Sequence, residues 1–177
     1  MLVSIDGFIE DPNGSIEWST PNEEIHRHFN ALEHETAIHF CGRKLYNIMD
    51  FWRTAERTEG LHDYELEFAR EYNGKPNFVF SRTLQKVQPG DTLMREIDID
   101  FVKNLKKGPG KYISIGGSDL ANAFLQLNLV DEIRLYIAPI ILGGGKPMIQ
   151  PISHTLKMKL VDTRSFKSGL VLLTYQN

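Results

Sequence analysis

The sequence predicts an α/β fold in which a mostly parallel central sheet is flanked by helices. Segments typical of buried strands alternate with amphipathic segments along most of the chain, and this alternation indicates βαβ units. Only a turn at residues 167–169 separates the last two expected strands, so we expect an antiparallel hairpin at one edge of the sheet. No internal repeat, low-complexity segment or linker interrupts the pattern, and we interpret residues 1–177 as one domain.

Each element is expected from its hydrophobic periodicity and from the turn residues that bound it. In chain order, strands are expected at 2–5, 36–42, 77–81, 92–97, 111–115, 130–142, 156–166 and 170–176. Helices are expected at 19–34, 42–52, 61–72, 100–108 and 118–128. Turn signals mark several boundaries, namely Asp6-Gly7, Pro12-Asn13-Gly14, Asn73-Gly74 and Gly108-Pro109-Gly110.

The first helix carries the clearest start signal. Thr20 is expected to cap it, and Pro21 suits its first position. Glu23 and Glu24 follow where the helix dipole favours acidic side chains.

The composition predicts an ordinary soluble globular protein. Hydrophobic residues make up 41% and charged residues 24% of the chain, and the net charge of −3 gives no global electrostatic case for nucleic acid. The single cysteine, Cys41, lies in an apolar run, which is typical of a buried, inert thiol. With no basic leader and no long apolar run, we expect neither signal peptide nor membrane span, and hence a cytoplasmic protein.

The histidines do not predict a metal site. His26 and His28 are two residues apart and point to different faces of a helix, and His39 lies among apolar strand residues. Because no pair has the spacing of metal ligands, we interpret these residues as solvated or core histidines and expect no metal.

Three expected strands end in sequences that could hold a phosphate: "CGRK" at 41–44, "FSRT" at 80–83 and "IGGS" at 115–118. Ligands of parallel sheets bind beyond the carboxyl ends of the strands, and helix starts offer free N–H groups to phosphate. The double glycine could also be only a tight turn, because the patterns G-x-G-x-x-G and G-x-x-x-x-G-K-[ST] are both absent. We interpret "GGGK" at 143–146 as a turn.

The order of the motifs resembles a known family. "SIDGFI", "GRKLY", "FSRT" and "IGGSDLANAFLQLNLVDEIRLYIAPIILGGGKPMI" together resemble the dihydrofolate reductase fold, and more closely the reductase domain of riboflavin biosynthesis, the RibD C-terminal domain family. The resemblance covers nearly the whole chain. It implies a three-layer fold with a mostly parallel sheet of about eight strands, an NADPH-dependent reductase, and a homodimer built around the strand at 130–142.

The resemblance also implies roles for individual residues. Gly116, Gly117, Ser118 and Asp119 would face the pyrophosphate of NADPH, and Gly42, Arg43 and Lys44 would open a second phosphate-facing helix. Ser81 and Arg82 would hold the adenosine ribose and its 2′-phosphate. The backbone around Leu2 and Ile9 would hold the nicotinamide carboxamide.

A second motif, "WSTPNE" at 18–23, resembles the segment of dihydrofolate reductase whose acid holds the pteridine. The resemblance assigns that role, catalytic and substrate-binding, to Glu23 as a buried carboxylate. Alternatively, Glu23 is only an acid in the first turn of a helix. Trp18 would form a wall of the substrate cleft, with core packing as the alternative.

The sequence departs from the family pattern in three ways. Leu45 stands where the family often has a threonine, the first strand is short although central in the family, and one cysteine cannot build the deaminase zinc signature. We therefore expect a reductase acting on a small heterocyclic molecule, either a ribosylaminopyrimidine or dihydrofolate. The other hypothesis is a nucleotide-binding protein without turnover.

Overall fold

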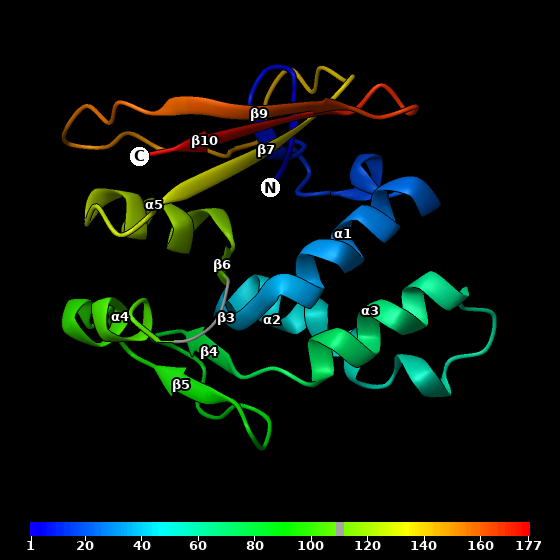
Figure 1. The fold of residues 1–177 in the computed structure, drawn as a ribbon, viewed down its shortest axis with the longest axis horizontal. Coiled ribbons are helices and arrows are strands. Elements are labelled where there is room, and N and C mark those ends of the chain that lie inside the picture. The colour runs from blue at the N-terminus through cyan, green and yellow to red at the C-terminus, as the bar shows by residue number, and fades with distance from the viewer. Residues whose placement is uncertain (109–111) are drawn as a thin grey trace. The chain divides into compact units, whose positions relative to one another are not determined.

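The computed structural model describes residues 1–108 and 112–177 (Figure 1). Its contacts divide the chain into two compact units. The first unit comprises residues 1–22 and 122–177, and the second comprises residues 23–121. We describe each unit by itself.

The first unit is built on a four-stranded sheet of order β1-β7-β10-β9. Its strands are β1 (Leu2–Ser4), β7 (Glu132–Ala138), β9 (Lys159–Ser165) and β10 (Val171–Gln176). β1 and β7 are parallel, whereas β10 is antiparallel to both β7 and β9. β2 (Phe8–Glu10) and β8 (Lys146–Pro147) form a separate two-stranded ribbon, and a 3-10 turn, η1, covers Glu17–Ser19. The expected C-terminal hairpin is confirmed.

The loops of the first unit are held by Asp6. Its carboxylate accepts hydrogen bonds from the Ser4 hydroxyl at 2.6 Å and from the N–H groups of Leu142 and Gly143 at 3.1 and 2.7 Å. These donors lower the pKa of Asp6, with the Ser4 hydrogen bond the largest cause. The turn after β1 is thereby tied to the loop after β7. Residues 143–145 form a bend in which Gly143 and Gly145 have positive φ, whereas Lys146 begins β8, so the expected turn at "GGGK" covers only the glycines.

The second unit is built on a four-stranded parallel sheet of order β5-β4-β3-β6. Its strands are β3 (Thr36–Gly42), β4 (Asn77–Phe80), β5 (Thr92–Met94) and β6 (Tyr112–Gly116). Its helices are α1 (Glu23–Glu35), α2 (Arg43–Met49), α3 (Asp63–Asn73) and α4 (Ile99–Leu105), with 3-10 turns η2 (Asp50–Arg53) and η3 (Ala55–Arg57). Helix α5 (Ser118–Gln126) follows β6 directly and continues into the first unit.

Apolar and polar side chains share the core of the second unit. Phe40 and Val79 are almost completely buried in β3 and β4, and α1 packs against α3 through His26, Tyr64 and Phe68. His39 is buried as expected for a core histidine. Its ring bonds to the Glu33 carboxylate at 2.8 Å and to the Ser114 hydroxyl at 2.7 Å.

The structure corrects three expectations. The first helix begins at Glu23, because the Thr20 hydroxyl bonds back to the Glu17 carbonyl in the preceding 3-10 turn and caps nothing ahead of it. The described strands form separate sheets instead of one sheet of about eight strands; β1, only three residues long, pairs with β7 alone. The expected stop of α4 falls partly on Pro109 and Gly110, which lie outside the described residues, whereas α4 itself ends at Leu105.

Candidate phosphate-binding site

The carboxyl ends of the four parallel strands meet at one edge of the second unit's sheet. The register aligns Gly42 with Phe80, Cys41 with Gly116, and Phe80 with Met94. The segments "CGRK", "FSRT" and "IGGS" therefore come together at this edge, as the parallel pattern predicted. Such an edge is where ligands of α/β sheets bind.

Gly117 holds the starts of α2 and α5 close together. Its φ of +93° is a conformation that residues with a side chain rarely adopt. A Cβ at this position would lie 3.7 Å from the backbone nitrogen of Gly42, the residue before α2. Gly117, directly before α5, therefore lies against Gly42, directly before α2, so the two helices begin at neighbouring positions. Helix starts carry N–H groups without partners inside the helix.

Gly116 is a glycine for a different reason. A Cβ built on it would lie 2.0 Å from Cδ2 of Leu45, in the first turn of α2. Leu45 in turn packs on the buried cluster formed by Cys41, Tyr46 and Val79. The apolar side chain that replaces the family's threonine thus occupies the space above Gly116, so this glycine permits close packing of α2 against β6.

Polar and charged side chains surround the two helix starts. Arg43 and Lys44 are exposed in the first turn of α2, and no side chain caps that helix at Gly42. Ser118 is buried at the start of α5, and Asp119 is exposed beside it. A phosphate here would meet two cations and one acid, so the local balance of charge is positive although the chain as a whole is negative.

The third strand end is a tight turn at residues 81–84, which we call the 81–84 turn. The Ser81 hydroxyl oxygen accepts hydrogen bonds from the N–H groups of Thr83 and Leu84 at 3.2 and 3.0 Å. The Ser81 N–H donates to the carbonyl of Met94, the last residue of β5. Arg82 is exposed in this turn. The turn is ordered by Ser81, one of the two residues that the resemblance assigns to the ribose and 2′-phosphate.

Arg95 belongs to this edge, although our sequence analysis did not select it. Its Nη1 donates to the carbonyl oxygens of Ser81 at 2.8 Å and Leu84 at 2.6 Å. The signal was available, because Arg95 follows the last residue of β5 as Arg43 follows the last residue of β3.

A buried carboxylate fixes the elements beneath the edge. Asp91, with 4% of its side chain exposed, accepts hydrogen bonds from Tyr46 at 2.6 Å, Arg53 at 2.5 Å and Asn77 at 3.2 Å. Burial and the bond to Asp91 raise the pKa of Tyr46. Burial also raises the pKa of the nearby Cys41 thiol to about 12, which fits the inert thiol expected from the sequence. The network joins α2, η2 and β4.

The remaining selected residues are distributed over both units. Leu2 lies in β1, Ile9 in β2 and Trp18 in η1, all in the first unit. The indole N–H of Trp18 is buried and has no hydrogen-bond partner among the described residues. Such a donor is uncommon and would suit a residue that faces a ligand. The cleft role of Trp18 and the nicotinamide roles of Leu2 and Ile9 stay predictions.

Glu23 does not have the environment that the folate-like hypothesis requires. That hypothesis needs a buried carboxylate, but the Glu23 side chain is 60% exposed. It forms an ion pair with Arg27 at 2.9 Å, one turn further along α1, and Arg27 also contacts Asp63. This is a solvated helix pair, which agrees with the alternative that Glu23 is an acid in a first helical turn.

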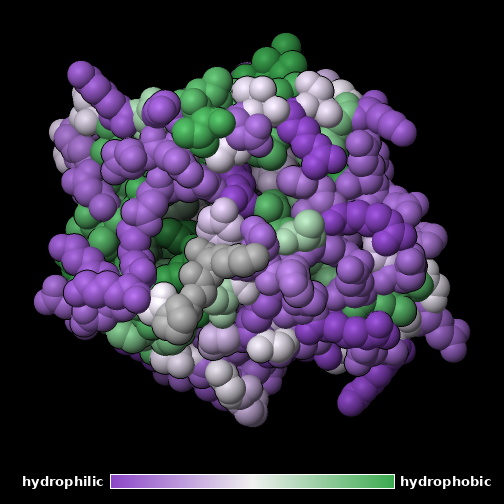
Figure 2. All heavy atoms as spheres, viewed as in Figure 1, coloured by the Kyte–Doolittle hydropathy of each residue, from purple (hydrophilic) through white to green (hydrophobic). Residues whose placement is uncertain are grey.

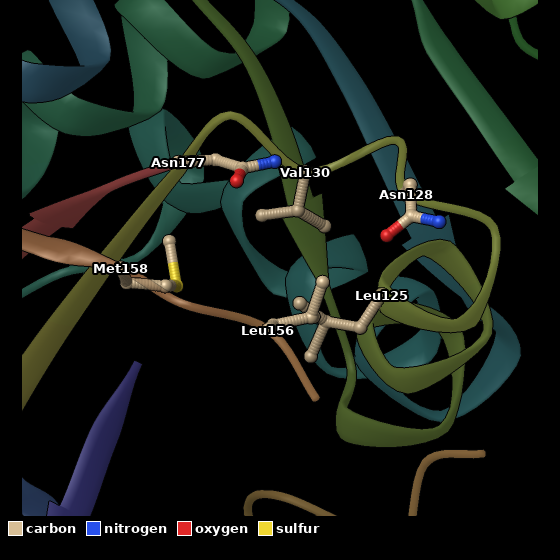
Figure 3. Close-up of a pocket in the computed structure, with 6 residues that line it drawn as sticks. All are labelled: Leu125, Asn128, Val130, Leu156, Met158 and Asn177. Atoms are coloured by element: carbon tan, nitrogen blue, oxygen red, sulfur yellow. The ribbon is translucent and has the colours of Figure 1, made fainter. Parts of the chain in front are cut away.

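A small concavity lies in the first unit and is mainly apolar. It holds only about 10 Å³, the room that a single water molecule needs. Figure 3 shows Leu125, Val130, Leu156 and Met158 around it, with two amide side chains, Asn128 and Asn177, at its border. Its lining includes no charged side chain, so the pocket does not suit a phosphate. In the described part of the chain, no group of three His, Cys, Asp or Glu side chains could hold a metal ion.

The surface in view is mostly hydrophilic, with apolar side chains in small groups (Figure 2). Within residues 1–108 and 112–177, no helix is both long enough and apolar enough to cross a membrane.

The fold is found in solved structures of reductase-like proteins. A putative riboflavin biosynthesis protein from Shewanella sp. PV-4 matches with a TM-score of 0.76 and 24% identity, over 99% of this chain and 95% of that chain. A diaminohydroxyphosphoribosylaminopyrimidine deaminase/5-amino-6-(5-phosphoribosylamino)uracil reductase from Thermotoga maritima matches with a TM-score of 0.65 and 16% identity, over 99% of this chain and 54% of that chain. The chain therefore shares the α/β fold of these solved structures.

The sequence comparisons identify the family. The model of the RibD C-terminal domain matches residues 1–172. The uncharacterized protein YyaP of Bacillus subtilis is 34% identical over 176 residues, which cover 99% of this chain and 91% of the relative. A second Bacillus subtilis relative, the uncharacterized protein YwjB, is 27% identical over 97% of this chain and 92% of its own length. The chain belongs to the RibD C-terminal domain family.

Proposed function

We propose that this protein is an NADPH-dependent reductase that transfers hydride to a C=N or C=O bond of a small heterocyclic substrate. The observation that carries the proposal is the pair of helix starts held together by Gly42 and Gly117 at the carboxyl edge of the parallel sheet. Backbone N–H groups placed in this way suit the pyrophosphate of a dinucleotide. Membership of a reductase domain family supports the same proposal.

Within this proposal, each group of residues has a binding task. Residues 42–44 and 116–119 bind the pyrophosphate through backbone N–H groups and two cationic side chains. Ser81 and Arg82 bind the ribose and its 2′-phosphate. The backbone at Leu2 and Ile9 orients the nicotinamide, and NADPH itself supplies the hydride.

For the substrate, we favour a ribosylaminopyrimidine such as 5-amino-6-(5-phosphoribosylamino)uracil, after which the reductase activity of the structurally similar Thermotoga maritima protein is named. The exposed, ion-paired state of Glu23 counts against dihydrofolate, because a pteridine site uses a buried carboxylate as hydrogen-bond acceptor. Dihydrofolate reduction remains the alternative activity within the same reaction class.

The test measures NADPH oxidation in the presence of each of the two substrate classes. The readout is the loss of absorbance of the reduced nicotinamide. We expect turnover with the ribosylaminopyrimidine and none with dihydrofolate. NADPH binding without oxidation of NADPH by either class would instead support a nucleotide-binding protein without turnover. Turnover with dihydrofolate alone would exchange the two substrate assignments.

A further inference from the structure

We propose that Arg95 is an additional binding residue for the 2′-phosphate, held in position by the 81–84 turn. This inference rests on the proposed function, since it concerns the phosphate that distinguishes NADPH from NADH. Neither the sequence motifs nor the resemblance to the family led to Arg95. It follows from the hydrogen bonds that the side chain makes.

The position of Arg95 places it at the phosphate-binding edge. It directly follows Met94, the last residue of β5, and β5 pairs in parallel with β4 up to Phe80. Ser81 follows Phe80 directly and bonds through its N–H to the Met94 carbonyl. Arg82 and Arg95 thus lie just beyond the carboxyl ends of two adjacent strands, β4 and β5.

The hydrogen bonds of Arg95 hold one side of its guanidinium, at Nη1, and leave the side with Nε and Nη2 available to a ligand. Nη1 donates to the carbonyls of Ser81 and Leu84, the first and last residues of the 81–84 turn. Among the described residues, Nε and Nη2 have no hydrogen-bond or ion-pair partner, and the residue is exposed. A guanidinium has five N–H donors in a planar fork, so Nε and Nη2 can still donate to two oxygens of one phosphate.

If Arg95 served only to stabilise the 81–84 turn, its positive charge and its remaining N–H donors would have no role. Two neutral carbonyls can be satisfied by backbone or water, whereas a permanently charged arginine is suited to a phosphate dianion. No carboxylate among the described residues forms an ion pair with Arg95, and the hydrogen-bond partners of Nη1 are neutral carbonyls. Because two hydrogen bonds already restrict its rotamers, Arg95 loses less entropy when it binds a ligand than a free surface arginine does.

The test compares Arg95→Met, which keeps the length of the side chain but removes its charge and donors, with Arg95→Lys, which keeps the charge. Arg57→Met is the matched control, because Arg57 is another exposed arginine of the same unit, in η3. Calorimetry measures the binding of NADPH, NADH, 2′,5′-ADP and 5′-AMP to each full-length variant, and thermal melting verifies that each variant is folded.

We expect Arg95→Met to weaken NADPH and 2′,5′-ADP at least tenfold, with NADH and 5′-AMP unchanged, and Arg95→Lys to lose less. Arg57→Met should bind all four as the wild type does. Equal losses for ligands with and without the 2′-phosphate, or no loss, would overturn the role of Arg95 and leave the proposed function standing. If Arg95→Met does not fold, the ligands with and without the 2′-phosphate are compared on Arg95→Lys instead. A loss confined to NADPH and 2′,5′-ADP would then support the role of Arg95. Wild-type protein that binds neither cofactor would overturn the proposed function, and this inference with it.

Discussion

At the scale of single residues, the double glycine after β6 has two physical causes. Gly117 adopts a positive φ and sets the distance between two helix starts. Gly116 leaves space for Leu45, which packs on the core of the second unit. Gly117 therefore meets a conformational requirement, the positive φ, and Gly116 meets a packing requirement between α2 and β6.

Substitutions should separate these two causes. Gly116→Ala forces the flexible end of the partly buried Leu45 side chain to move, so it should destabilise the fold near the low end of the about 1–3 kcal/mol that overpacking usually costs. In a protein that already carries Leu45→Ala, the substitution Gly116→Ala should lower the free energy of unfolding by less than it does in the wild type. Denaturant unfolding of the four proteins measures this coupling. Additive effects in this cycle would show that Leu45 is not the side chain that requires a glycine at 116.

Gly117→Val should act on the ligand as well as on the fold. The valine must adopt a strained φ, and its branched side chain would fill the space beside the Gly42 nitrogen. We expect the variant to lose NADPH binding while it remains folded. Melting curves with and without NADPH give the answer, and a folded variant that is stabilised by NADPH as the wild type is would contradict the phosphate role of this glycine.

At the scale of elements, the sequence predicted the order of the longer strands and helices better than the sheets that the strands form. The strand at 36–42 has the expected bounds, since an apolar run before a glycine and a basic helix start is a strong local pattern. Thr20 shows the limit of such patterns. Its hydroxyl can accept from a backbone N–H of the following helix or donate to a backbone carbonyl before it, and in the structure it donates to the carbonyl of Glu17. Neither the Leu45–Gly116 contact nor the carbonyl partners of Arg95 could be predicted, because each joins elements whose distance depends on the assembled sheet.

The core between β3 and β4 gives a pH prediction. Burial raises the pKa of the Cys41 thiol from 9.0 to about 12, so the folded protein keeps a proton that the unfolded chain releases above pH 9.0. The contribution of Cys41 to stability is therefore constant below that pH and decreases as the pH rises toward 12.

The same burial should protect the thiol from reagents. At about pH 8, an aromatic disulfide reagent should leave the native protein unmodified and label one thiol after denaturation. Cys41→Ser provides the blank. Rapid labelling of the native protein would show that Cys41 is more accessible and more acidic than its place in β3 indicates.

At the scale of the whole molecule, the first unit's sheet has a face suited to a second copy of this chain. The register aligns Ile133 with Tyr175, Leu135 with Leu173, and Ile137 with Val171, and Leu160 adjoins Tyr175 from β9. Alternate residues of a strand share a face, so these side chains lie together. They carry no charge, they are partly exposed, and Leu160 is 46% exposed. An uncharged face is compatible with its own copy across a two-fold axis.

We propose that two copies associate through this face, which contains the strand that the resemblance assigned to a homodimer. Leu135→Glu would place a charge at the centre of the face and should convert the dimer to a folded monomer, because burying two facing carboxylates is unfavourable. Sedimentation velocity measures the mass, with Arg57→Glu as the control. A wild-type protein that stays monomeric at high concentration would contradict the proposal.

The most direct test of the central claim is the affinity of the wild-type protein for the two nicotinamide cofactors. If the edge formed by β3, β4, β5 and β6 binds a dinucleotide and its arginines bind the 2′-phosphate, calorimetry should show NADPH bound at least tenfold more tightly than NADH, a difference of about 1.4 kcal/mol. Equal affinities would remove the role assigned to the arginines at this edge. No binding of either cofactor would contradict the account as a whole.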